Sequence, residues 1–92
     1  MTTRLVIDVT QKDIDLGIRS SCHLCPIARA LLRGTDHSGT RVAVGYEGII
    51  VQHGPVSVTY KPSARAATFI HRFDTRGKEA VKPARFALQR LP

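Results

Sequence analysis

The sequence predicts a small α+β domain, in which a mixed, mostly antiparallel sheet of four or five strands carries two or three helices mainly on one face. Three observations indicate this fold class. Apolar residues alternate along residues 4–9 and along 84–92, β-branched residues dominate 41–62, and apolar residues recur at helical spacing over 64–76. With 92 residues, the chain is expected to form a single compact domain over 1–92, in the order β-α-α-β-β-(β)-α-β.

The first strand is predicted from the segment RLVIDV, residues 4–9. Leu5, Ile7 and Val9 alternate with polar or charged neighbours, which is typical of a strand with one buried face. Val6 interrupts the polar alternation on the opposite face. We therefore expect some cover on that second face as well.

A short helix over residues 11–16 is expected next. Thr10 is a good N-cap, and Asp13 stands three residues later, at the position of an approximate capping box. Gly17 follows the last helical residue, where glycine favours a left-handed C-cap. The segment therefore predicts a single short helix between Thr10 and Gly17.

The second helix is predicted over residues 26–33. Cys25 is expected at the N-cap and Pro26 at the first helical position, where its missing N–H costs nothing. Arg29 and Arg33 are four residues apart and are expected to share the polar side. Gly34 ends the helix, and TDHSGT, which follows it, has the composition of a loop. The broad apolar face consists of Ile27, Ala28, Leu31 and Leu32.

The second half of the chain predicts two or three antiparallel strands, one long helix and a final strand. Glycines interrupt the β-branched residues of 41–62, which indicates turns between strands. The segment QHGP in that region is predicted to be one of these turns. The helix is expected between an N-cap at Ser63 and a stop at Gly77. Its core face consists of Ala66, Phe69, Ile70 and Phe73. In the last strand, Phe86 and Leu88 are expected to point inward.

Cys22 and Cys25 form a Cys-x-x-Cys pair at the start of the second helix, for which three interpretations are open. A helix N-terminus stabilises a thiolate, so the pair can be a redox site. It can also be half of a zinc site, with His23, His37, His53 or His71 as further ligands, although no second close pair of ligands is present. The favoured interpretation is structural, with Cys25 as a small buried cap and Cys22 as a loop thiol.

The charge of the chain is strongly positive, with 14 Lys and Arg against 7 Asp and Glu and a formal net charge of +7. Such a balance favours an acidic protein surface or nucleic acid as partner. At 100° per residue, Arg65, Arg72 and Arg76 fall within about 40° of one another on the long helix. With Lys78 and Lys82 just beyond, they form the candidate partner-binding face.

No motif in the chain indicates an enzyme. It contains no nucleophile elbow, no glycine-rich phosphate loop and no His-Glu-x-x-His. No cofactor is expected beyond the zinc alternative at the cysteines. Apolar runs are too short to cross a bilayer and the N-terminus does not resemble a signal peptide, so no membrane contact and a cytoplasmic location are expected.

One further pattern extends over most of the chain. It consists of Thr10 with Asp13-Ile14, Gly17, Cys25-Pro26-x-Ala28-x-Ala30-Leu31, Phe69-Ile70, Phe73-Asp74 and Val81-x-Pro83-x-x-Phe86-x-Leu88. In these positions the chain resembles a group of small uncharacterised proteins of actinobacterial phages and prophages, whose pattern includes Cys25 and Pro26 but not Cys22. The resemblance implies a phage accessory protein in the host cytoplasm, a class that often acts by binding host or phage components.

The function expected from the sequence is therefore that of a non-enzymatic protein that binds a host or phage protein with an acidic surface. The first alternative is a nucleic-acid-binding regulator that uses the basic helix face. The second is a thiol-redox or zinc protein centred on the Cys-x-x-Cys. A homodimer is also expected to be possible, because small sheets pair at exposed edges.

Overall fold

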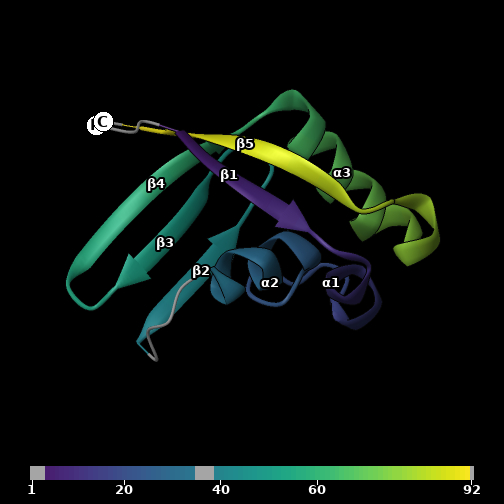
Figure 1. Ribbon diagram of the computed structural model, residues 1–92, viewed down its shortest axis with the longest axis horizontal. Coiled ribbons are helices and arrows are strands. Elements are labelled where there is room, and N and C mark those ends of the chain that lie inside the picture. The colour runs from purple at the N-terminus through teal and green to yellow at the C-terminus, as the bar shows by residue number, and fades with distance from the viewer. Residues whose placement is uncertain (1–3, 35–38, 92) are drawn as a thin grey trace.

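A computed structural model describes residues 4–34 and 39–91, which form a curled, antiparallel five-stranded sheet with three α-helices (Figure 1). The predicted α+β class and element order are confirmed, and the optional third strand of the middle region is present. The elements are β1 (Arg4–Val9), α1 (Gln11–Leu16), α2 (Pro26–Arg33), β2 (Thr40–Val44), β3 (Ile49–His53), β4 (Val56–Pro62), α3 (Ala64–Arg76), the 3-10 turn η1 (Lys78–Ala80) and β5 (Ala84–Arg90).

The strand order is β1-β5-β4-β3-β2, so the first and second strands of the chain lie at opposite edges of the sheet. All four neighbouring pairs are antiparallel. Because the sheet curls, α2 packs against both edge strands, β1 and β2, while α3 packs against β4 and β5 (Figure 1). The strand order also makes β1 and β5 neighbours, so that Arg85 donates to Asp8 across 77 residues.

One face of the sheet is buried against the helices and the other is exposed. The buried strand residues alternate with exposed ones, as in a sheet covered on one side. The expectation that Val6 is covered is wrong, since 49% of its surface is exposed on the face opposite the described helices. The strand side chains buried in the core are Ile7, Val9, Val42, Val44, Ile49, Phe86 and Leu88.

The connection from β1 to α1 follows the predicted capping box. The Thr10 Oγ1 accepts from the Asp13 N–H at 3.3 Å, and the Thr10 N–H donates to Asp13 Oδ2 at 2.9 Å. The predicted left-handed cap at Gly17 is wrong, because its φ is −67° and its backbone is extended. Glycine is needed there for space: a Cβ would lie 2.7 Å from Pro26 Cδ and 2.8 Å from the Asp13 carbonyl oxygen.

Replacing Gly17 with alanine should therefore destabilise the fold by about 1–3 kcal/mol, because the added methyl group forces α1 and α2 apart. Urea unfolding measures the change. Gly34 is a matched control, because it caps α2 with ordinary dihedrals and a Cβ there would meet nothing closer than 3.6 Å. If Gly34→Ala costs as much as Gly17→Ala, the close approach to Pro26 is not what requires glycine.

The two longer helices start and stop as predicted. Cys25 is the N-cap of α2 with Pro26 in the first turn, and Ser63 caps α3 by accepting from the Ala66 N–H at 3.2 Å. Gly77 ends α3 with a φ of +88°, which L-residues rarely adopt. The predicted core face of α3 is confirmed in full: Ala66, Phe69, Ile70 and Phe73 are all buried.

Candidate functional site

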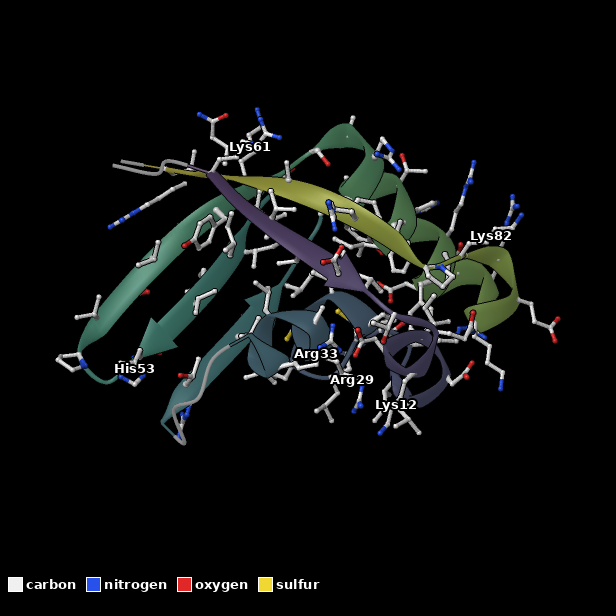
Figure 2. The ribbon with its side chains drawn as sticks, viewed as in Figure 1. Lys12, Arg29, Arg33, His53, Lys61 and Lys82 are labelled. Atoms are coloured by element: carbon white, nitrogen blue, oxygen red, sulfur yellow. The ribbon has the colours of Figure 1, made fainter. Side chains whose placement is uncertain are left out.

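A groove of about 540 Å³ lies between α3, η1 and β5, and it gathers three of the five predicted basic residues. Arg65, Arg72 and Lys82 line it, and all three are exposed. Figure 2 places Lys82 beside the start of β5. We call this site the α3 groove; its lining residues are Ala64, Arg65, Thr68, Phe69, Arg72, Ala80, Val81, Lys82, Ala84 and Phe86.

The floor of the α3 groove is apolar and firmly packed. The rings of Phe69 and Phe86 meet edge to face with 5.2 Å between their centroids, and both are almost fully buried. The Arg65 guanidinium lies 5.7 Å from the centre of the Phe86 ring, within the range of a cation–π interaction. The groove therefore combines a fixed apolar base with cationic side chains at its rim, and no acidic residue lines it.

The five residues of the predicted basic face lie in two separate hollows of the structure. Arg76 and Lys78 line a separate hollow of about 340 Å³ between α1 and the end of α3. Two carboxylates, Asp15 and Glu79, line that hollow as well. The charge of that hollow is therefore mixed. Of the predicted basic face, only the three residues that line the α3 groove form a purely cationic rim.

Other arginines of the chain pair with carboxylates of the fold, whereas the described contact of Arg65 is with the Phe86 ring and not with a carboxylate. Arg33 and Arg29 pair with Asp13, and Arg85 donates from Nε to Asp8 Oδ1 at 2.8 Å. Within residues 4–34 and 39–91, none of the five predicted basic residues takes part in an ion pair. Their charge is thus available to a partner.

Asp13 is the buried centre of a polar network that joins β1, α1 and α2. Arg29 and Arg33, expected to share the polar side of α2, both pair with this carboxylate. Figure 2 shows the two arginines on α2, next to α1. Arg33 also donates to the Asp8 carbonyl at 2.7 Å. Burial acts to raise the pKa of the Asp13 carboxyl, but hydrogen bonds from Arg33 and Thr10 outweigh it and hold that pKa below its ordinary value.

Cys22 and Cys25 lie in different environments. Cys22 is exposed, whereas Cys25 is buried, and burial raises the pKa of the Cys25 thiol. A raised pKa leaves less of the thiolate that nucleophilic and redox chemistry requires. Both cysteines are free thiols. These features match the structural interpretation of Cys25, while the redox interpretation of the pair stays a prediction.

The loop that carries Cys22 and His23 covers the outer edge of β2. The Val44 N–H donates to the Cys22 carbonyl at 2.8 Å, and His23 Nδ1 donates to the Val42 carbonyl at 2.7 Å. Both groups of β2 point away from β3, where they would otherwise offer hydrogen bonds to another strand. The loop therefore has a structural role that the sequence did not reveal.

Zinc ligation by this loop stays a prediction. In the described part of the chain, no three His, Cys, Asp or Glu side chains come together as metal ligands. His23 donates to a main-chain carbonyl, and His71 lies beside Tyr46 with 5.9 Å between ring centroids. His37 falls outside the described residues. Metal analysis of protein purified without chelator tests the prediction, since a structural site requires one equivalent of zinc.

Asp74, near the end of α3, holds the same loop from its other side. Its carboxylate accepts from the Ser20 N–H at 3.0 Å and from the Tyr46 hydroxyl at 3.1 Å. Arg19 donates to the Asp74 and Thr75 carbonyls, which lie at the C-terminal end of the helix. One signal in the sequence could have indicated this contact: an acidic residue near a helix C-terminus opposes the helix dipole, so it needs a compensating partner.

Comparison with family models, curated proteins and solved structures gives no match to this chain. None of the helices in residues 4–34 and 39–91 has the length and apolar character that crossing a membrane requires.

Proposed function

We propose that this protein is a small, non-enzymatic binding protein that holds an acidic segment of a partner protein in the α3 groove. One observation carries the proposal: Arg65, Arg72 and Lys82 surround an apolar floor, without a carboxylate among the lining residues. Such a groove suits an extended segment that offers acidic side chains to the rim and one aliphatic side chain to the floor. If the chain is phage-encoded, as the resemblance implies, the partner is a host or phage protein and the site of action is the host cytoplasm.

The packing of the aromatic rings favours a protein partner over nucleic acid. Single-stranded nucleic acids are held by exposed aromatic faces on which bases stack. Phe69 and Phe86 are only 6% and 3% exposed and already pack against each other, so they offer no free face. Nucleic acid remains the second candidate, because the net charge of +7 supports contact with a phosphate backbone.

Fluorescence anisotropy with defined probes tests the proposal. One probe is a glutamate-rich peptide with a single leucine, and the others are a DNA duplex and a single-stranded RNA of mixed sequence. We expect the peptide to bind, and we expect the combined variant Arg65→Glu, Arg72→Glu, Lys82→Glu to lose at least about a hundredfold in affinity, which corresponds to about 2.7 kcal/mol.

A matched variant separates the groove from net charge. Lys12→Glu, Arg41→Glu and Arg90→Glu together make the same change of charge at exposed positions outside the groove. This variant should keep most of the affinity for the peptide. Equal losses in both variants would mean that binding follows net charge alone. Tighter binding of the nucleic acids than of the peptide, with a steep dependence on salt, would support the second candidate instead.

A further inference from the structure

The two edges of the sheet are covered differently by the rest of the chain. At the β2 edge, Cys22 and His23 occupy the outward hydrogen-bonding groups of Val44 and Val42. At the β1 edge, the described residues of the strand form a ladder with β5 alone, and one outward group, the Asp8 carbonyl, accepts from Arg33. A strand edge whose other outward groups are not paired with a strand is a template for further pairing. β1 is therefore the edge at which this sheet can accept another strand.

One hydrogen bond shows which groups of β1 face that edge. Arg33 Nη2, on α2, donates to the Asp8 carbonyl from outside the sheet. In an antiparallel edge strand, residues whose main-chain groups point inward alternate with residues whose groups point outward. Arg4 and Val6 therefore share the outward direction of Asp8. Arg4 and Val6 present both main-chain groups to an incoming strand, and Asp8 presents its N–H, while the Asp8 carbonyl would be shared with Arg33.

A groove of about 650 Å³ follows the same edge. Four consecutive residues of β1, from Leu5 to Asp8, line it together with the end of α2 and with Val51 and Tyr60. Because consecutive residues of a strand point to opposite faces, a groove that all four line runs along the strand's edge. Its wall toward the core is largely apolar, and includes Ile7 and Leu31. An added strand would find both hydrogen-bonding groups and apolar surface there.

The sequence of β1 is complementary to a second copy of itself. In Arg-Leu-Val-Ile-Asp, Arg4 and Asp8 stand at equal distances on either side of Val6. When two such strands run antiparallel with Val6 opposite Val6, Arg4 of each copy lies opposite Asp8 of the other. The same register places Leu5 opposite Ile7 on the buried face. It also joins the outward-facing main-chain groups of both strands, because hydrogen-bonded pairs recur every second residue.

We propose that two copies of this chain form a two-fold symmetric dimer by antiparallel pairing of their β1 edges about Val6, which joins the two sheets into one. The pairing brings together the two Val6 side chains, each about half exposed in the single chain. The Asp8 side chain is 63% exposed beside Arg85, which leaves it accessible to a second guanidinium. A shift of register by two residues would lose both charge pairs, so the charges select the symmetric register.

Sedimentation analysis from micromolar to millimolar concentration tests the proposal. The unmodified chain should approach the mass of two chains as the concentration rises. Arg4→Glu should raise the dissociation constant about tenfold or more, because two equivalent charge pairs change from attractive to repulsive. Arg4→Lys should leave the constant nearly unchanged. Arg41→Glu, an equal charge change on the strand at the other edge of the sheet, serves as the control.

A second variant tests the pairing of the main chain. Proline at position 6 removes an N–H that faces outward, so Val6→Pro should preserve the β1–β5 ladder and abolish the dimer. Hydrogen exchange adds a direct readout: the Asp8 amide should be protected at high concentration and not at low concentration. A chain that stays monomeric at millimolar concentration would overturn the proposal, and so would a dimer that survives both Arg4→Glu and Val6→Pro. Neither result would affect the binding function proposed for the α3 groove, because that groove lies away from β1.

Discussion

Replacing Asp13 with alanine should lower the free energy of unfolding by about 3 kcal/mol. The carboxylate is almost fully buried and joins three elements, through the Thr10 cap in α1 and through Arg33 and Arg29 in α2. Its removal takes away the capping box and the carboxylate with which both guanidinium groups pair. Arg29 Nε is buried without a hydrogen-bond partner in the described structure, so the ion pair with Asp13 is its described compensation.

The Asp13 carboxylate should make the free energy of unfolding decrease as the pH falls. The folded-state pKa of Asp13 is lower than its unfolded value of 3.8, so its contribution is complete at neutral pH. The contribution should decrease as the pH falls below about 5 and disappear once the pH is below the folded-state pKa. The stability of Asp13→Ala should therefore change less between pH 7 and the acid range than that of the unmodified chain.

Urea unfolding at several pH values measures both effects, and Asp15→Ala provides the control. Asp15 lies on the same helix and has the same charge, but it is exposed, and in the described structure its carboxylate accepts from the Gln11 side chain alone. Its replacement should change stability by less than about 0.5 kcal/mol. If the two variants lose similar stability and have similar pH profiles, the buried network around Asp13 is not a major source of stability.

Removing Arg19 and Asp74 together should release the loop that covers the β2 edge. These two residues make the side-chain hydrogen bonds that tie the loop to the end of α3, through Ser20 and the last helical carbonyls. In the combined variant Arg19→Ala, Asp74→Ala, the Val44 amide should exchange with solvent at least about tenfold faster, which corresponds to about 1.4 kcal/mol of lost protection. The uncovered edge should also make the variant more prone to self-association.

Hydrogen exchange followed by NMR checks this result residue by residue. The variant Arg76→Ala, Glu79→Ala is the matched control, because it also removes one positive and one negative charge near the end of α3. Neither residue contacts the loop through a hydrogen bond or ion pair in the described structure. Unchanged protection of the Val44 amide in the first variant would show that the Cys22 and His23 contacts hold the edge without help from α3.

Local patterns predicted most of the fold because they reflect local physics. Alternation gave β1 and β5, helical periodicity gave α3, and the residues at Thr10, Cys25-Pro26 and Ser63 marked the starts of helices. Gly17 shows the limit of such reasoning. Its position after a helix predicted a left-handed cap, whereas the structure requires glycine because Pro26, nine residues later, packs against it.

The candidate site was predictable only in part for a similar reason. Helical spacing placed Arg65 and Arg72 on one side of α3, but it could not place Lys82 in the same groove or Arg76 outside it. That division depends on the path of the chain after Gly77, where η1 and β5 fold back along the helix. The apolar floor under the cations likewise needs Phe69 and Phe86 to meet across two elements.

The sequence by itself determined the three helices, the outer strands β1 and β5, the order of the elements, most core residues and the positive charge, because each follows from neighbours along the chain or from composition. Only the tertiary structure decided which charges are used internally and which remain available. Arg33 reaches Asp13 across 20 residues, and Ser20 reaches Asp74 across 54. The role of Cys22 and His23 was also decided by the tertiary structure. The Cys-x-x-Cys spacing suggested redox or zinc chemistry, whereas the fold brings this loop against β2, where Cys22 and His23 form hydrogen bonds with the outward main-chain groups of the strand.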